Sequence, residues 1–473
     1  MGLLCTIAND NAQYPFQDKQ PMALRYIDLF AGLGGFHLAL SKLRCKCVFA
    51  SELRDDLRRL YKINFPELDE KHLKGDITQV KVEDIPAHDI LCGGFPCQPF
   101  SQAGKRLGFQ DEGRGDLFFK ICEIIQYHRP RYIFLENVSN LKGHDNGDTW
   151  KIIKRELERL EYYVPEPEIL SPHQFGIPQH RKRIYIVAID KNQVENPSFE
   201  FPKPLKNAVC DITRYIDETD TDYMKLKPET RLQLEVWEEF IENLYRRGRP
   251  IPTFPIWAME FGANYPIDIA PAKLSSPKPL IGCRGKLGRI IPKGNLEDCL
   301  ALLPKYAQTD KADVFPKWKI KYIEQNRRFY ADNQDWLDEW IEKVRLFENS
   351  HLKMEWNCGK TARVSMEDKI IQFRASGIRI KLPNFSPALN LVGTQVPILP
   401  WVNLPKETLS EGEPAKGRYM TVREAAKLQG MQDLKFGNDE FALSQSRCYE
   451  ALGNAVNVDI VYKIAKKLIN NGR

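Results

Sequence analysis

The sequence lacks the features that would place the protein in or across a membrane. It has no apolar run close to the about 20 residues that a membrane-spanning helix needs. Its N-terminus has neither the basic segment nor the apolar segment of a signal peptide. We therefore expect a cytoplasmic protein that has no membrane partner.

Cysteine is present, but it is not organised into a framework. The chain has 11 cysteines, and the close pair Cys45 and Cys47 does not have the CxxC spacing. Disulfide scaffolds and zinc sites need paired or regularly spaced cysteines. An odd and scattered set is typical of a reducing compartment, so we predict neither disulfides nor a bound metal.

The composition is that of an ordinary soluble globular protein. The chain has 473 residues, enough for two domains, with 42% hydrophobic and 28% charged residues. Its net charge is +6 and its pI about 8.6. This mild excess of positive charge permits an anionic partner such as nucleic acid but does not demand one.

The first ordered stretch has the pattern of a nucleotide-binding unit. A buried strand at 26–30 runs into a glycine turn at 31–35, and helical spacing follows at 36–43. A second strand at 47–51 ends at Glu52, 20 residues after the first glycine of the turn. Glycines let the backbone approach a ligand, and an acid at this distance can hold ribose hydroxyls. The motif is not a full GxGxxG, so a purely structural glycine turn stays an alternative.

Strands and helices continue to alternate as far as about residue 190, beginning with a helix predicted over Asp55–Asn64. This alternation predicts an α/β fold with a doubly wound, mostly parallel sheet, in which ligands bind at the carboxyl ends of the strands. Five residues with chemical or binding potential fall at or just after predicted strands. They are Phe30, Glu52, Asp76, Cys97 and Glu136.

Cys97 lies in the stretch DILCGGFPCQPFSQ, residues 89–102. Prolines on both sides predict a stiff turn after a strand, because proline lacks an N–H and restricts the residue before it. A thiol on such a turn is well placed to act on a bound ligand. Taken alone, the cysteine would be read as a small buried hydrophobic residue, which is what most free cysteines are. Four glycines between 104 and 115 follow, as in a lid or a plain surface loop.

The alternation stops at about Pro197, and prolines become frequent. A glycine-rich basic segment at 282–289 contains Arg284 and Lys286, which suit contacts to DNA or are simply solvated. Two helices are predicted within 315–349, where aromatic and basic residues interleave. These residues could contact nucleic acid. Alternatively, the aromatic residues pack in the core and the basic residues face solvent. Regularity returns near Tyr419, where Thr421 and Glu424 have the pattern of a capping box for a helix through Leu428. We predict a tail at 1–22, a catalytic and cofactor-binding domain at 23–196 completed by 411–473, and a target-recognition domain at 197–410.

Seven motifs in order resemble the cytosine-C5 DNA methyltransferases, particularly the bacterial modification enzymes. They are DLFAGLGG at 28–35, GDIT at 75–78, GGFPCQPFS at 93–101, ENV at 136–138, QHRKR at 179–183, REAAKLQGM at 423–431 and ALGNAV at 451–456. The resemblance implies the fold of methyltransferases that depend on S-adenosylmethionine, with a separate, irregular target-recognition domain inserted. The motif ALGNAV has alanine where many members have serine.

The resemblance also implies roles for individual residues. The cofactor would be S-adenosyl-L-methionine, bound by Phe30, Gly32, Leu33, Gly34, Gly35, Glu52, Asp76, Ile77, Pro96 and Asn454. Cys97 would be the nucleophile, Glu136 would contact the target base, and Arg183 would steady it. DNA contacts would come from Gln98, Ser101, Gln102 and Arg181, besides Arg284 and Lys286. The implied partner is double-stranded DNA with a short specific site. A cognate restriction endonuclease without a stable complex, and a monomeric state, are further expectations.

The chemistry supports these roles independently. Cytosine C5 is a poor nucleophile, and adding a thiolate at C6 makes the ring reactive enough to take a methyl group. A carboxyl group at N3 favours the addition by sharing a proton, so we expect it to have a raised pKa. An arginine offers fixed donors to the ring oxygen. The base must be flipped out of the duplex to reach such a site.

Three other functions fit parts of the sequence. A few proteins with this catalytic domain methylate tRNA, although the long insert favours a duplex DNA site. An NAD-dependent oxidoreductase would use the same nucleotide-binding unit but leaves the later motifs unexplained. A catalytically inactive DNA-binding protein does not need both Cys97 and Glu136.

Overall fold

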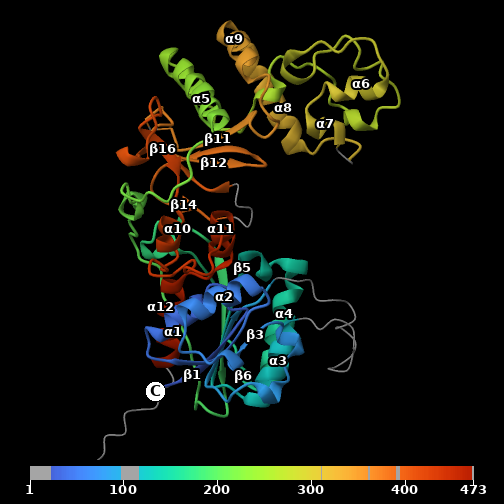
Figure 1. The fold of residues 1–473 in the computed structure, drawn as a ribbon. Coiled ribbons are helices and arrows are strands. Elements are labelled where there is room, and N and C mark those ends of the chain that lie inside the picture. Colours follow the sequence, from blue (N-terminus) through green and yellow to red (C-terminus); the bar gives the residue numbers. More distant parts are fainter. Residues whose placement is uncertain (1–22, 97–116, 310–311, 361–362, 390–394, 471–473) are drawn as a thin grey trace, which may run out of the picture.

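The computed structural model describes residues 23–96, 117–309, 312–360, 363–389 and 395–470. The chain forms two parts, one below the other in Figure 1. The lower part combines the N-terminal half with the C-terminal helices. The upper part contains the segment between them.

The lower part is built on a mixed sheet with the strand order β3-β2-β1-β4-β5-β9-β6, and β7 pairs with β9 at one end. Strands β1 to β5 are mutually parallel, and β9 runs antiparallel to its three neighbours. The strands are β1 (Arg25–Leu29), β2 (Lys46–Ser51), β3 (Leu73–Lys74), β4 (Ile90–Gly94), β5 (Tyr132–Val138), β6 (Tyr162–Tyr163), β7 (Glu168–Leu170) and β9 (Arg183–Asp190).

Helices cover both faces of this sheet. Alternate residues of a strand point to opposite faces, so Tyr26 of β1 joins one hydrophobic core and Ile27 joins the other. The first core packs against α1 (Gly35–Ser41), α2 (Asp55–Asn64), α10 (Val422–Leu428), α11 (Gln445–Asn454) and α12 (Val458–Asn470). The second core packs against α3 (Leu117–His128) and α4 (Asp148–Arg159). The predicted α/β fold with a doubly wound, mostly parallel sheet is confirmed.

Local details agree with the sequence in most places. Helix α2 has the predicted bounds, and Thr421 and Glu424 form the expected capping box at the start of α10. The position of Glu136 differs slightly from the prediction. It lies inside β5, and we expected it at the end of a strand that stops at Leu135. The strand is longer than its apolar run because β9 pairs with it as far as Val138.

The upper part is more regular than the sequence predicts. We expected an irregular insert, but it contains a six-stranded sheet with the order β10-β11-β13-β12-β15-β16. Its strands are β10 (Ile256–Trp257), β11 (Lys353–Asn357), β12 (Ile370–Arg374), β13 (Gly377–Lys381), β15 (Ile398–Asn403) and β16 (Lys416–Tyr419). Its helices are α5 (Pro228–Arg246), α6 (Leu296–Ala301), α7 (Lys305–Thr309), α8 (Lys317–Ala331) and α9 (Gln334–Val344). The strands are short and pair out of chain order, so no repeating pattern marks them.

The contacts between the two parts include a short parallel strand pair and a buried ion pair. The short strands β8 (Gln179–His180) and β14 (Ser386–Pro387) pair in parallel. On β16, the buried guanidinium of Arg418 donates to both carboxylate oxygens of Glu424 on α10, at 2.9 and 2.7 Å. These contacts fix the upper part against the segment that precedes β9 and against the C-terminal helix α10 of the lower part.

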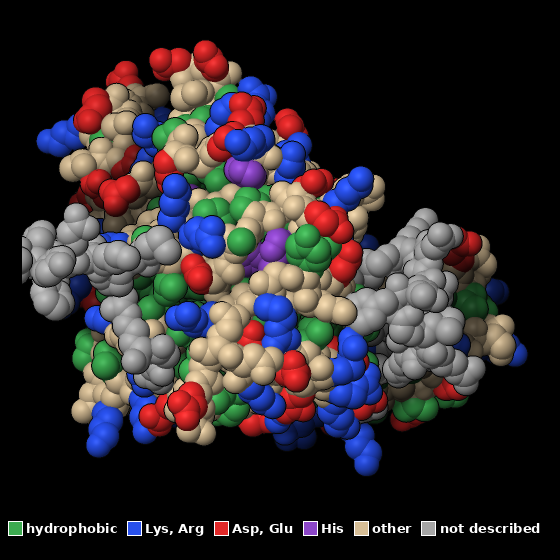
Figure 2. Space-filling view, turned by 90° about the horizontal axis from the view of Figure 1, so that it is seen from below, with side chains coloured by type: hydrophobic (Ala, Val, Ile, Leu, Met, Phe, Trp, Pro, Cys, Tyr) green, Lys and Arg blue, Asp and Glu red, His purple; other side chains and the backbone are tan. Residues whose placement is uncertain are grey.

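The outer surface shows no concentration of one charge on the face in Figure 2, where Lys and Arg side chains alternate with Asp and Glu. This view looks at the lower part from the end at which the C-terminus lies in Figure 1. Among the described residues, no helix has both the length and the apolar character to span a membrane.

Candidate active site

A cavity of about 410 Å³ opens at the carboxyl ends of the parallel strands. Its size is within the range of about 300–1,000 Å³ that is usual for small-molecule sites. Eight of the predicted site residues line it together. They are Phe30, Glu52, Asp76, Ile77, Pro96, Glu136, Arg183 and Asn454. These residues come from segments more than 400 residues apart in the chain, and the strand order brings them to one rim.

The glycine turn after β1 brings backbone close to this rim. Gly32 has a φ of 54° and Gly34 a φ of 75°, which are left-handed conformations that glycine adopts without strain. Phe30 also has a positive φ of 57°, an uncommon conformation for a residue with a side chain. Such strain concentrates at functional sites, and here it accompanies a ring that lines the cavity.

The other residues of the turn serve packing. Leu33 is buried, and added Cβ atoms on Gly34 and Gly35 would lie 2.3 Å from Phe65 and 2.5 Å from Val456. Neither Leu33 nor these two glycines lines the cavity. The structure therefore separates the predicted cofactor residues into a lining group and a group that shapes the turn.

Glu52 is held in one orientation by backbone donors. The N–H of Gly32 donates to its Oε2 at 2.9 Å, and the N–H of Arg54 donates to its Oε1 at 3.0 Å. The side chain is largely buried, so these bonds stabilise the carboxylate where solvent does not. Each oxygen has further acceptor capacity for a ligand hydroxyl.

Asp76 and Ile77 also line the cavity, just after β3. Asp76 caps a 3-10 turn, Ile77–Gln79, by accepting the N–H of Thr78 at 2.9 Å and its hydroxyl at 2.8 Å. Both bonds use Oδ1, while Ile77 is buried beside it. An aspartate next to an apolar side chain suits a ligand with a flat apolar face and a polar edge.

Glu136 and Arg183 form an ion pair inside the cavity. Nε of Arg183 lies 3.0 Å from Oε1 of Glu136 without the alignment of a hydrogen bond, so this buried oxygen still lacks a hydrogen-bonding partner. Burial raises the pKa of Glu136 above its ordinary value of 4.5, although the charges of Arg183 and Arg181 act against it. A carboxyl group with a raised pKa and an unused acceptor is suited to share a proton with a substrate.

Asn137 is a site residue that the sequence motif contains but that we did not single out. Its buried side chain donates from Nδ2 to the carbonyl of Phe95 at 2.8 Å. Phe95 precedes Pro96, so this bond ties β5 to the segment that leads into Cys97. The signal was the ENV motif itself, which places an amide directly after the carboxyl residue.

The structure corrects the prediction for Arg181. It is 2% exposed, and its guanidinium donates to the carbonyls of Gly453 at 2.8 Å and Ala455 at 2.7 Å. A guanidinium committed to buried carbonyls is not available to DNA phosphates. Arg181 instead holds the C-terminal segment, which includes Asn454, against the start of β9.

The remaining predicted residues fall elsewhere. Cys97, Gln98, Ser101 and Gln102 lie outside the described residues. Arg284 is exposed and Lys286 half-buried in the upper part, and neither lines the cavity. Among the described residues, no group of three or more His, Cys, Asp or Glu side chains is arranged to hold a metal.

The fold and the cavity define a doubly wound α/β domain in which a glycine turn after β1 and an acid after β2 meet at one rim. Comparison with known proteins identifies the family. Residues 24–274 and 284–470 match the family described as C-5 cytosine-specific DNA methylase. The chain belongs to this family.

Named relatives agree with this assignment. The chain is similar to the Type II methyltransferase M.HhaI of Haemophilus parahaemolyticus, with 46% identity over 190 residues, which cover 40% of this chain and 56% of that protein. It is similar to the Type II methyltransferase M.AluI of Cellulosimicrobium cellulans, with 29% identity over 95% of this chain and 92% of that protein. Among solved structures, the S. pombe Dnmt2 methyltransferase gives a TM-score of 0.44 at 16% identity, covering 95% of this chain and 98% of that one.

The matches differ in extent. The chain spans about half the length of several curated relatives, with shares of 56%, 48% and 50% for three of them.

Proposed function

We propose that the protein is a DNA (cytosine-5-)-methyltransferase that uses S-adenosyl-L-methionine and acts as the modification enzyme of a restriction-modification system. The observation that carries this proposal is the pair Glu136 and Arg183, which shares one cavity with Glu52, Asp76 and Asn454. Glu136 is a carboxyl group suited to share a proton, and Arg183 is a cation fixed beside it. Both lie next to residues that suit a nucleoside. The family match and the names of the relatives support the same activity.

The cavity fits the proposed cofactor. Glu52 presents a carboxylate whose orientation is fixed by two backbone N–H groups, and Asp76 offers a second acceptor next to Ile77. Phe30 adds an aromatic ring to the lining of the cavity. These groups match ribose hydroxyls, a polar base edge and a flat base. When bound, S-adenosylmethionine supplies an electrophilic methyl group.

The chain's own residues would prepare the cytosine. Cys97 follows Pro96 directly in the sequence and would add its thiolate to C6 of the target base. Glu136 would share its proton with N3 as electron density moves there, and Arg183 would donate to the ring oxygen. C5 would then be nucleophilic and take the methyl group, as the bond between the methyl carbon and the sulfonium sulfur breaks and leaves a neutral thioether. Loss of the C5 proton restores the aromatic ring and expels the thiolate of Cys97.

A base inside a duplex cannot reach this cavity, so the enzyme would flip the target cytosine. The glycine-rich segment 104–115, which lies outside the described residues, is our candidate for the loop that closes behind it. The upper part would supply the surface that recognises the DNA sequence, as predicted for 197–410. Arg284 and Lys286 are candidates for DNA contacts there.

A methyl-transfer assay tests the proposal. The protein is incubated with labelled S-adenosylmethionine and either duplex DNA or tRNA, and the DNA is then sequenced after bisulfite treatment. We expect label in DNA alone, at C5 of one cytosine in a short repeated site. Labelling of tRNA without labelling of DNA would replace the proposed substrate, and no transfer to either would remove the proposed activity.

A further inference from the structure

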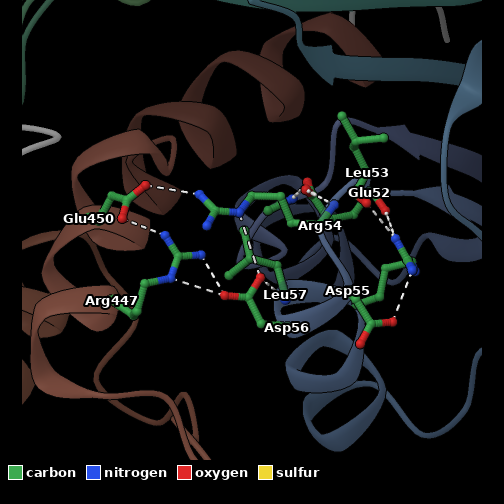
Figure 3. A network of polar contacts seen from close by, with 10 residues as sticks. Glu52, Leu53, Arg54, Asp55, Asp56, Leu57, Arg447 and Glu450 are labelled. Carbon is green, nitrogen blue, oxygen red and sulfur yellow. Dashed lines mark hydrogen bonds and ion pairs between the residues drawn. The ribbon is translucent and has the colours of Figure 1, made fainter.

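Four charged side chains form a closed ring beside the cavity (Figure 3). Arg447 of α11 donates to Oδ2 of Asp56 on α2 from Nε at 3.0 Å and from Nη2 at 2.5 Å. Its Nη1 donates to Oε2 of Glu450. Arg54 donates to the other oxygen of Glu450 at 2.9 Å, and its Nε lies 3.6 Å from Oδ1 of Asp56. Positive and negative groups therefore alternate around the ring.

The ring connects two distant segments at the margin of the cavity. Asp56 and Arg447 are 391 residues apart in the sequence, and both arginines line the cavity. Arg447 lies seven residues before Asn454 on α11, or two helical turns, so both face the same side. Arg54 is tied to Glu52 by its own N–H. A movement of Arg447 would therefore shift Asn454, and a movement of Arg54 would shift Glu52. Both Asn454 and Glu52 are proposed cofactor residues.

The ring is not needed to hold α11 in the fold. Ala451 and Leu452 of α11 are buried in the hydrophobic core, and Arg181 binds the carbonyls that follow them. The side chains of the ring keep 23% to 44% of their surface exposed. Breaking an ion pair at such positions changes the free energy of unfolding little. Removing the ring would therefore loosen the wall of the cavity without unfolding the protein.

We propose that Arg54, Asp56, Arg447 and Glu450 form an ionic latch that closes α11 onto α2 and retains the cofactor. The latch acts by positioning the two walls and touches no reacting atom. This inference rests on the proposed function, because it requires an S-adenosyl ligand in the cavity. It assigns to this chain a determinant of cofactor affinity that is separate from the methyl-transfer chemistry.

The latch makes cofactor affinity sensitive to salt. Ion pairs at partly exposed positions are screened as ionic strength rises, so the walls would separate more readily in concentrated salt. The hydrogen bond from Arg447 lowers the pKa of Glu450, and for Asp56 the contacts with Arg447 outweigh the opposing effect of burial and also leave the pKa low. Both carboxylates therefore stay charged at neutral pH, and salt is the variable that weakens the latch.

The test compares Arg447→Met with wild type. Methionine keeps the length of the side chain and removes its charge. The dissociation constant of S-adenosylhomocysteine is measured by calorimetry, and KM and kcat are measured with DNA. We expect Arg447→Met to raise the dissociation constant and the cofactor KM by about fivefold to tenfold, with kcat changed less than about twofold. Raising the salt concentration should weaken binding to wild type more than binding to the variant.

Two further variants complete the test. Arg447→Lys keeps the positive charge with fewer donors and should keep part of the affinity that Arg447→Met loses. Arg246→Met removes a surface ion pair with Glu242, which does not border the cavity, and should leave binding unchanged. Unchanged affinity in Arg447→Met, or a fall in kcat alone, would overturn the latch and leave the cofactor assignment standing. If wild type itself bound no S-adenosylhomocysteine, the cofactor assignment would fail and the latch with it.

Discussion

Arg183 lies with its Nε 3.0 Å from Oε1 of Glu136, across the antiparallel pair that β9 forms with β5. This ion pair exists because β9 runs antiparallel to β5. Arg183 is the first residue of β9 and faces Val138, so its side chain starts at the carboxyl end of β5, where the cavity opens. A parallel strand in this place would put its first residue at the other end of the sheet.

This pair leads to a prediction about pH. Glu136 has a pKa above 4.5 because it is buried, and the proposed mechanism needs its proton. The rate of methyl transfer under single-turnover conditions should therefore fall as pH rises through this pKa and the proton is lost. Glu136→Gln, which cannot share a proton, should lower the rate by about 10²–10⁴-fold and lose this limb of the profile. A variant with the wild-type profile would show that Glu136 carries no catalytic proton.

A second prediction concerns Cys97. Cys97→Ser should abolish methylation, because a hydroxyl is a far weaker nucleophile than a thiolate, while binding of cofactor and DNA stays largely intact. Duplex DNA with 5-fluorocytosine at the target should trap a covalent adduct with wild type, which mass spectrometry would map to Cys97. The fluorine blocks the final loss of a proton from C5. Full activity of the serine variant would rule out the covalent mechanism.

A third prediction uses the buried carboxyl group of Asp28 on β1. Burial raises its pKa well above the ordinary value of 3.8, and the charge of Glu52 raises it further. The unfolded chain then loses this proton at a lower pH than the folded protein. Between the two pKa values the folded state binds more protons, so the free energy of unfolding falls as pH rises.

Asp28→Asn removes this dependence. Relative to wild type, the variant should gain stability as pH increases, by up to about 1.4 kcal/mol per pH unit while the folded carboxyl group stays protonated. Urea unfolding at several pH values between 5 and 8 measures the difference. Asp439→Asn, at an exposed position, is the matched control. A constant difference between Asp28→Asn and wild type would mean that this carboxyl group has the same pKa in both states.

A fourth prediction concerns the contact between the two parts. The side chains of Arg418 and Glu424 are 0% and 1% exposed. Arg418→Met should lower the free energy of unfolding by about 3–5 kcal/mol, because it leaves a buried carboxylate without its partner. Adding Glu424→Gln should recover part of the loss by removing that charge. Urea unfolding measures both, and a double variant less stable than the single one would contradict this explanation.

The sequence predicted the parts of the site that depend on local pattern. The strand ends placed Glu52, Asp76 and Glu136 on one rim because every parallel strand ends at the same edge of the sheet. The capping box at Thr421 depends only on residues three positions apart. In each case the relevant neighbours are close in the chain or are related by the symmetry of the sheet.

The contacts that the sequence did not predict join distant segments. Arg181 was expected at DNA, but its guanidinium binds carbonyls more than 270 residues away. Arg447 was not singled out in the sequence, because its pairing with Asp56 depends on how α11 docks on α2. The six-stranded sheet of the upper part was missed because its strands have two to six residues and pair out of order. Periodicity tells which face of an element is buried, but not which element covers it.

The last prediction concerns the aromatic residues interleaved with basic ones at the start of α8. Trp318 is 55% exposed, and its ring meets Trp257 and Tyr322 edge-on, with centroids 6.5 and 5.9 Å away. The Nζ of Lys319 lies 5.7 Å from the centre of the Trp318 ring. An exposed ring held rigidly beside a cation is suited to contact DNA, through stacking and through the phosphates.

Trp318→Ala should therefore weaken binding of specific duplex DNA by about 1–3 kcal/mol, the range found for aromatic stacking on nucleic acid, and leave the affinity for S-adenosylhomocysteine unchanged. Fluorescence anisotropy with a labelled duplex measures the first quantity and calorimetry the second. Tyr245→Ala is the matched control, because Tyr245 is a 67% exposed aromatic on α5 of the same part. If both variants bound DNA as wild type does, α8 would not belong to the DNA-binding surface. If both lost affinity equally, Trp318 would have no special role, and the loss would reflect a general effect of removing exposed aromatic surface.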